Sequence, residues 1–353
     1  MAWSYKILSV FDIDIELHIS FLLFILLLLV LNVSFAFLIL LVFIYVTLHE
    51  LSHSYVALKN KINVKSITLL PIGGMSMIDT KDISPYTELK VSIAGPLFNF
   101  VMVYILLGLS VLFNWPLNEW LSAFVHGGIS SLSVFELFIF YSLYSNLILG
   151  SFNLLLPAFP LDGGRIFRAL LAYKLDYKRA TEVAKNVSIM ISIGLFLWAL
   201  LRFDVWIMLI SLFIIFGASA EYQGLLVTDA LSRAKLLDII ELKPTVVKES
   251  HGLQAVINLM LKKRRTSFIT DKMRTVSLRD IYQLRKKDQK TMHVNDVSKP
   301  IAPVSSTTDL NRVMETMANQ NTAVLPVMHG KKLVGVVYQE DIDKYVRMKE
   351  LLE

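Results

Sequence analysis

The residues best suited to chemistry stand in one short stretch, where His49-Glu50-Leu51-Ser52-His53 interrupts a long run of apolar side chains. Two histidines four residues apart project from one face of a helix, so both imidazoles can reach the same zinc ion. Glu50 overhangs that face and can take a proton from an attacking water molecule. Ionisable groups are costly inside a membrane segment, which favours this metal site over a hydrogen-bonded polar patch.

A third zinc ligand is expected, because a catalytic zinc usually has three protein ligands and one open position. The segment Pro157-Ala-Phe-Pro-Leu-Asp-Gly-Gly-Arg165 holds two prolines and two glycines, which rule out a continuous helix. Broken backbone at membrane depth is tolerated only where it lines protein or a water-filled cavity. Asp162 lies in this break and is the candidate third ligand; otherwise it begins the helix that follows.

A second broken stretch surrounds Gly73 and Gly74. Val64–Leu70 and Met75–Ile78 predict a short β-hairpin, whose edge could hold a substrate peptide as an added strand. The alternative is a plain connecting turn. Gly73 and Gly74 are therefore the candidate substrate-binding residues.

Asparagines in the apolar segments have two interpretations. The amide of Asn153, near Pro157, could donate to a developing oxyanion, or it could bond to a neighbouring helix. For Asn99, bonding between helices is the better interpretation. Gly95-Pro96 is expected to mark the start of a helix that packs closely on its neighbours.

The elements that carry these residues belong to a membrane protein. Of the 353 residues 55% are hydrophobic and 18% charged, which is too apolar for an ordinary soluble domain. The absence of cysteine excludes disulfides, thiolate metal sites and a cysteine nucleophile. Six stretches approach the length of about 20 apolar residues that a span needs. They are Leu17–Val33, Phe35–Leu58, Val91–Phe113, Val134–Leu155, Val187–Leu201 and Val205–Tyr222.

Basic residues set the expected orientation, because cytoplasmic loops are enriched in Lys and Arg. Lys59–Lys90 contains five such residues and Pro157–Asn186 six. Both loops, and with six spans both termini, are therefore expected in the cytoplasm of a multi-pass protein of the cell membrane.

The tail has a different character. Residues 222–353 carry a net charge of +7, against −1 for residues 1–221. Leu310–Asn319 predicts a helix, Ala323–Met328 and Leu333–Val337 predict strands, and a last helix begins near Glu340. Leu253–Leu261, Ser267–Thr270, Thr275–Ser277 and Arg279–Arg285 repeat this order about 55 residues earlier. A soluble α/β pair of similar units is predicted.

Taken in order, these motifs resemble the site-2 protease family of intramembrane zinc metalloproteases, in its prokaryotic branch with C-terminal CBS domains. Glu16-Leu-His18, Leu70-Pro-Ile-Gly-Gly74, Ala94-Gly-Pro96 and Leu161-Asp-Gly-Gly-Arg165 match around the His49–His53 motif. The resemblance implies a six-span enzyme with zinc on His49, His53 and Asp162, Glu50 as general base and Asn153 at the oxyanion. One departure is that three residues, Leu154–Leu156, separate Asn153 from Pro157 where the family usually has two, and the added residue turns Asn153 by about 100° on a helix.

The tail resembles a tandem CBS pair, a module that often binds adenine nucleotides. Ser277 and Asp280 match the family's ribose-binding spacing. Asp341 matches as well, but Tyr338 replaces the usual Ser or Thr three residues before it. The pair is also a candidate for homodimerisation, and its basic run Lys262–Arg265 could instead contact anionic lipid.

The sequence thus predicts an α-helical polytopic membrane protein of six transmembrane helices with a short β-hairpin, plus a cytoplasmic α/β tandem CBS domain. The expected domains are a zinc protease domain at 1–222, a linker at 223–235 and CBS-like units at about 236–290 and 291–353. The predicted activity is zinc endopeptidase cleavage of a transmembrane substrate for regulated intramembrane proteolysis, with one zinc per chain. The expected partners are that substrate and the bilayer, and no nucleic acid.

Two other functions use the same residues. A zinc-binding or ion-transporting membrane protein regulated by CBS domains would need the ligands but no general base. A membrane hydrolase acting on lipid would differ in substrate.

The topology can be tested directly, because the chain contains no cysteine. We expect a single cysteine at Ser122 to react with a membrane-impermeant maleimide from outside intact cells, and one at Ser250 to react only after lysis. Permeabilised cells serve as the control for reactivity. The opposite labelling pattern would overturn the six-span arrangement.

Overall fold

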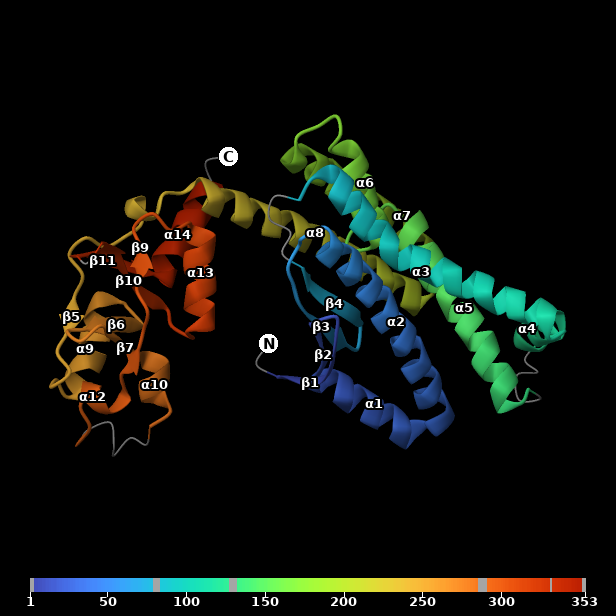
Figure 1. Ribbon diagram of the computed structural model, residues 1–353, viewed down its shortest axis with the longest axis horizontal. Coiled ribbons are helices and arrows are strands. Elements are labelled where there is room, and N and C mark those ends of the chain that lie inside the picture. Colours follow the sequence, from blue (N-terminus) through green and yellow to red (C-terminus); the bar gives the residue numbers. More distant parts are fainter. Residues whose placement is uncertain (1–2, 79–82, 127–131, 285–290, 331, 351–353) are drawn as a thin grey trace. The chain divides into compact units, whose positions relative to one another are not determined.

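In the computed structural model, the apolar stretches form helices long enough to cross a membrane (Figure 1). Within the described residues, 3–78, 83–126, 132–284, 291–330 and 332–350, five helices meet that length. They are α2 (Val33–Lys59), α3 (Pro85–Leu112), α5 (Val134–Leu155), α7 (Tyr177–Arg202) and α8 (Val205–Arg233). The chain is therefore a multi-pass membrane protein.

The first predicted span is shorter than expected. It forms α1 (Ile19–Leu31), whose 13 residues rise about 20 Å, against the roughly 30 Å of a hydrocarbon core. Asn32 separates α1 from α2, because its side chain accepts a hydrogen bond from the Phe35 N–H at 3.0 Å and caps α2. The count of six spans stays a prediction.

The chain divides into two compact units, Met1–Tyr222 and Gln223–Glu353. Helix α8 begins in the first and ends in the second. The segment predicted as a linker, 223–235, is therefore helical as far as Arg233.

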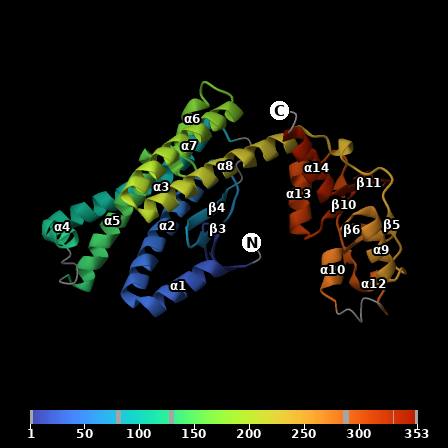
Figure 2. The ribbon, with the colours of Figure 1, turned by 180° about the vertical axis from the view of Figure 1, so that it is seen from behind.

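A four-stranded sheet, of order β1-β2-β3-β4, stands at one end of the helices of the first unit (Figures 1 and 2). Its strands are β1 (Ser4–Val10), β2 (Ile13–His18), β3 (Val64–Leu70) and β4 (Gly73–Ile78). The antiparallel pairing of β3 with β4 confirms the predicted hairpin. The sequence did not predict β1 and β2, which add to β3 through a parallel pairing. Figure 2 shows β3 and β4 beside α2, and this places β4 near Glu50.

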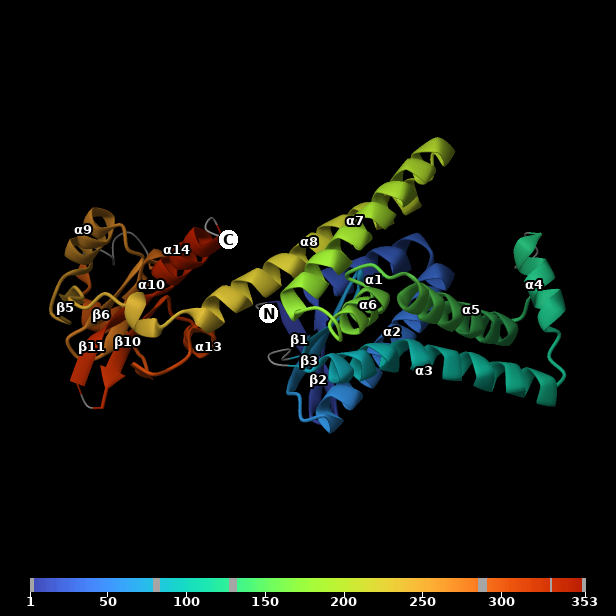
Figure 3. The same ribbon diagram turned by 90° about the horizontal axis from the view of Figure 1, so that it is seen from above.

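The remaining helices of the first unit complete the arrangement. Helices α3 and α5 run side by side, with α4 (Leu117–Val125) at their far end, and the short α6 (Asp162–Leu171) lies against α3 and α7 (Figure 3). One prediction from the sequence is wrong: Gly95-Pro96 does not start a helix. Pro96 lies inside α3, which begins at Pro85 after the Ser84 cap.

The second unit contains two similar halves, and the predicted order of helix, strand, strand and helix is confirmed in both. The first half contains β5 (Val246–Val247), α9 (Leu253–Lys263), β6 (Ser267–Thr270), β7 (Arg274–Ser277) and α10 (Leu278–Tyr282). The second contains β9 (Val304–Ser305), α13 (Leu310–Asn319), β10 (Val324–His329), β11 (Lys332–Tyr338) and α14 (Gln339–Glu350).

The two halves exchange short segments. After α12 (Val294–Val297), β8 (Lys299–Pro300) pairs with β7 of the first half, and Glu241 pairs with Val336 in β11 of the second. The end of the first predicted unit, residues 285–290, lies outside the described residues. Because of the exchange, no single cut in the sequence separates the halves cleanly.

Candidate metal centre

Three candidate ligands from two distant helices meet inside the first unit. His49 and His53 lie one turn apart on α2, and Asp162 is the first residue of α6. One ligand atom from each lies within 4.8 Å of the others. All three residues are buried, with at most 9% of their surface exposed. The structure thus brings together the histidine pair and the residue predicted from the broken segment.

The spacing of the donor atoms fits a tetrahedral zinc site. Asp162 Oδ2 lies 3.0 Å from His49 Nε2 and 3.2 Å from His53 Nε2, and the two Nε2 atoms are 3.1 Å apart. Zinc bonds to nitrogen and oxygen of about 2.0–2.1 Å at tetrahedral angles require donors about 3.3 Å apart. Three protein donors also leave the fourth position open.

Hydrogen bonds on the far side of each imidazole fix which nitrogen faces the centre. His49 Nδ1 lies 2.5 Å from Asn99 Oδ1, and His53 Nδ1 lies 2.6 Å from the Val91 carbonyl oxygen. Both partners only accept, so each Nδ1 carries a hydrogen, and a neutral ring then presents its Nε2 lone pair to the centre. With both rings neutral, two imidazole nitrogens and one carboxylate oxygen face one another as acceptors, an arrangement that a bound cation stabilises.

Asn99 is the residue whose importance sequence reasoning missed. Its Nδ2 donates to Asn146 Oδ1 at 2.8 Å, and Asn146 Nδ2 donates to the Ser142 carbonyl oxygen at 2.7 Å. The expected bond between helices is thus present, but the same amide also orients a metal ligand. The sequence signal that could have indicated this role is its position one helical turn after Gly95-Pro96, the pair expected to pack closely on neighbouring helices.

A glycine allows α3 to approach the two histidines. A Cβ atom at Gly95 would lie 2.6 Å from His49 Nε2 and closer still to His53 Nε2. No side chain fits there without displacing both imidazoles. Close packing was predicted for Gly95, and its target is the metal centre.

Glu50 lies next to the ligands but outside their triangle. Its Oε2 accepts a hydrogen bond of 2.6 Å from Ser76 Oγ on β4, and a Cβ at Gly74 would lie 2.6 Å from Glu50 Cγ. Ser76 is a second residue that the sequence did not single out. Of the two predicted substrate-binding glycines, Gly74 is packed against Glu50, whereas Gly73, at φ +138°, begins the edge strand β4 with open space beside it.

Asn153 lies in the last turn of α5 and is half-buried. Within the described residues, the amides hydrogen-bonded around the centre are those of Asn99 and Asn146, and the Asn153 side chain makes no hydrogen bond to them. This agrees with the added leucine before Pro157.

Close packing holds Asp162 at the start of α6. A Cβ at Gly164 would lie 2.5 Å from the Phe159 nitrogen, and Gly163 is equally confined by the Leu156 carbonyl oxygen. The Phe159 N–H donates to Ser188 Oγ on α7 at 2.9 Å. The two glycines after Asp162 therefore let α6 begin directly against the broken segment.

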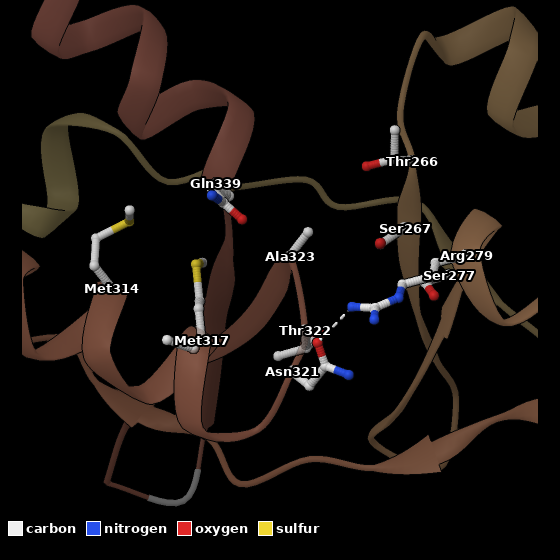
Figure 4. Close-up of a pocket in the computed structure, with 11 residues that line it drawn as sticks. Thr266, Ser267, Ser277, Arg279, Met314, Met317, Asn321, Thr322, Ala323 and Gln339 are labelled. Carbon is white, nitrogen blue, oxygen red and sulfur yellow. Dashed lines mark hydrogen bonds between the residues drawn. The ribbon is translucent and has the colours of Figure 1, made fainter. Parts of the chain in front are cut away.

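In the second unit, a cavity of about 290 Å³ lies between the halves (Figure 4). Hydroxyl groups of Thr266, Ser267 and Ser277 line one side, and Met314 and Met317 of α13 line another. Ser277 Oγ donates to Asp280 Oδ2 at 2.6 Å, and Asp280 also forms an ion pair with Lys299. Ser277 is thus at the cavity wall, with Asp280 directly behind it.

Asp341 has a different environment, because Arg265 occupies it. The Arg265 guanidinium donates to both carboxylate oxygens at 2.7 Å and lies 4.1 Å from the centre of the Tyr338 ring. Burial lowers the pKa of Arg265, but its hydrogen bonds with Asp341 outweigh this and raise that pKa above its ordinary value. Burial raises the pKa of Tyr338. Both groups therefore keep their protons at neutral pH.

Comparison with known proteins agrees with this geometry. The profile described as peptidase family M50 matches residues 36–197, and the CBS domain profile matches residues 294–347. Zinc metalloprotease MJ0392 from Methanocaldococcus jannaschii is 34% identical over 309 residues, covering 87% of this chain and 84% of that protein. A solved structure, the site-2 protease from Methanocaldococcus jannaschii, is 38% identical and covers 62% of this chain and 95% of that one, with a TM-score of 0.46.

The membrane helices and the three converging donors therefore define a zinc metalloprotease of the intramembrane, site-2 protease type. The chain belongs to peptidase family M50 and carries a C-terminal CBS domain.

Three glycines allow a test of the centre's packing. We expect Gly95→Ala to lose zinc and activity, because the new methyl group displaces both imidazoles. Gly74→Ala should keep zinc but lower activity, because the new methyl group meets Glu50 and Val46 and neither histidine. Gly108→Ala, also on α3, has open space and should keep both, with helix stability unchanged or raised by about 1 kcal/mol.

Zinc per chain by elemental analysis, peptide cleavage and thermal unfolding in detergent would measure these effects. A Gly95→Ala protein with full zinc and wild-type activity would contradict the close approach of α3.

Proposed function

We propose that this metalloprotease hydrolyses a peptide bond within a transmembrane segment of a protein substrate, with zinc on His49, His53 and Asp162 and with Glu50 as general base. The observation that supports it best is the convergence of the three candidate ligand atoms at the turn of α2 that also carries Glu50. The proposed role is regulated intramembrane proteolysis.

Zinc, when bound, would polarise the scissile carbonyl and activate the attacking water molecule. Glu50 takes a proton from that water and delivers it to the amine nitrogen as the C–N bond breaks. The Ser76 hydrogen bond holds Oε2 of Glu50, which leaves Oε1 to carry the proton. One water is consumed and no acyl-enzyme forms.

The substrate segment must be extended before it can be cut, because a transmembrane helix hides its peptide bonds in internal hydrogen bonds. We propose that it adds to the β4 edge at Gly73 and Gly74, where backbone groups can pair with an extended chain. Since Gly74 contacts Glu50, a strand bound there runs past the general base. Asn153 remains the proposed donor to the oxyanion.

The proposal includes the domain assignment and orientation. Residues 1–222 form the protease domain, and both termini face the cytoplasm with the CBS pair. The supporting observation is the concentration of Lys and Arg in Lys59–Lys90 and Pro157–Asn186.

An ion-transporting or zinc-sensing protein would use the same three ligands. It would not need Glu50, whose carboxylate is held by Ser76 next to the centre. The role of Glu50 therefore separates the two functions.

We expect Glu50→Gln to lower cleavage of a membrane-embedded substrate by about 100-fold or more, because the isosteric amide cannot accept the proton. Its zinc content should stay near one per chain. Cleavage in liposomes, with products identified by mass spectrometry, and elemental analysis would measure both.

Ligand variants are the matched controls. His49→Ala, His53→Ala and Asp162→Ala should lose zinc and cleavage together. Full zinc in Asp162→Ala would contradict the third ligand, whereas undiminished cleavage by Glu50→Gln would contradict the general base.

A second proposed function, binding of an adenine nucleotide, is favoured by the cavity beside Ser277. Its hydroxyl groups suit a ribose and its methionines suit a base, with Asp280 behind Ser277 as the carboxylate acceptor. Asp341 also matches the motif, but Arg265 already binds both its oxygens. The same pair is the proposed surface for a homodimer.

We expect calorimetry with AMP and ATP to show one nucleotide per chain. Asp280→Ala should weaken binding at least tenfold, and Asp341→Ala should leave it within about twofold, because Arg265 occupies that carboxylate. Analytical ultracentrifugation of the same samples reports dimerisation. Two equal sites, or a stronger effect of Asp341→Ala, would contradict the assignment.

A further inference from the structure

A group of buried and partly buried charges surrounds α6 and has no part in the proposed chemistry. It consists of two guanidinium groups, Arg165 and Arg168 on α6, and two carboxylates, Glu88 on α3 and Glu221 on α8. The Arg168 and Glu88 side chains are only 6% and 8% exposed. The two cations and two anions balance, which lets them share a buried site.

Arg168 is the centre of this charge cluster. Its Nε donates to Glu88 Oε1 at 2.8 Å, its Nη2 bonds the same oxygen, and its Nη1 donates to Glu221 Oε1 at 2.9 Å. The Phe159 and Tyr177 rings lie 4.9 Å and 5.0 Å from the guanidinium carbon. Its planar fork is therefore held in direction as well as in position.

Asp162 stands six residues before Arg168 on the same helix, which is about 9 Å along the axis. Helix α6 has only ten residues, its N-cap makes no side-chain hydrogen bond, and so short a helix is marginal without tertiary contacts. Anchoring Arg168 to α3 and α8 therefore also fixes the rotation and depth of the helix turn that carries Asp162.

Arg165 connects the cluster to the centre electrostatically. It lies one turn after Asp162 and interacts with Glu221, Asp162 and Glu50. Its Nε is shielded from solvent and has no hydrogen-bond partner among the described residues. Arg165 thus adds positive charge to the surroundings of these carboxylates, and its Nε forms no hydrogen bond with them.

Stability alone does not explain such a cluster, because well-packed apolar residues often stabilise a protein as much as a buried ion pair. A directional function does. We propose that Glu88, Arg168 and Glu221 are positioning residues, which hold α6 so that the Asp162 carboxylate meets the two imidazoles at zinc-binding distance. The inference rests on the proposed role of Asp162 as a zinc ligand.

The test uses the purified full chain and measures zinc affinity by chelator competition, together with the visible spectrum of the cobalt-substituted protein. Arg168→Gln should weaken zinc binding by about 10–100-fold, the range for groups that orient metal ligands. Glu221→Gln should weaken it less, because Glu88 still holds Arg168. Arg168→Lys should recover part of the affinity. Arg179→Gln removes an exposed pair with Glu182 and should change nothing.

Unpaired buried charge could unfold the single variants, so a double variant separates stability from positioning. Glu88→Gln with Arg168→Met removes one anion and one cation and leaves Glu221 with Arg165 as its counter-charge. We expect near-normal thermal unfolding, weakened zinc binding and a changed cobalt spectrum.

Normal zinc affinity and spectrum in the folded double variant would overturn the positioning role. If Asp162→Ala loses zinc in the same assay, the role of Asp162 as a ligand stands, and the normal double variant overturns only the positioning role. If Asp162→Ala keeps its zinc, the proposed third ligand fails and the inference fails with it.

Discussion

Three acceptor atoms that face one another at 3.0–3.2 Å are the constraint on which the first unit depends. In an apolar helix bundle such atoms repel unless a cation lies between them, since no water screens their charge. The surrounding structure keeps them there all the same. Asn99 and the Val91 carbonyl fix both tautomers, and Gly95 lets α3 close over the imidazoles. A metal centre is thus built into the helix packing.

The irregular backbone segments of the first unit also lie around the candidate metal centre. Hydrocarbon forbids exposed peptide groups, so loops and strand edges survive at membrane depth only against protein or water. Here the broken segment before Asp162 packs against α6 and α7 through Gly164 and Ser188, and β4 lies against Glu50. Each irregular piece therefore lies next to either the candidate ligand Asp162 or Glu50, the proposed general base.

Local spacing made part of this predictable. The histidine pair depends only on helical geometry, and Asp162 was found because prolines and glycines mark its segment. The hydrogen bonds of Asn99, Ser76 and Arg168 join residues 50, 26 and 80 positions apart in the sequence. No local sequence pattern predicts such pairs. Strands β1 and β2 were missed because they gain their place by pairing with β3. Pro96 was misplaced because a membrane helix tolerates proline where neighbouring helices satisfy the freed backbone.

The tail shows how one repeated fold can carry two unlike clefts. Its halves repeat the same order of elements, and Ser277 and Tyr338 each end the second strand of a half, three residues before an aspartate. At Ser277 the small side chain leaves a cavity, whereas at Tyr338 a ring supports Arg265, which binds Asp341. The tyrosine, which looked like a lost ligand contact, instead completes an internal cation–π and ion-pair site. The repeat therefore predicts related positions in the two halves, and side-chain size decides that Ser277 lines a cavity whereas the chain's own Arg265 occupies Asp341.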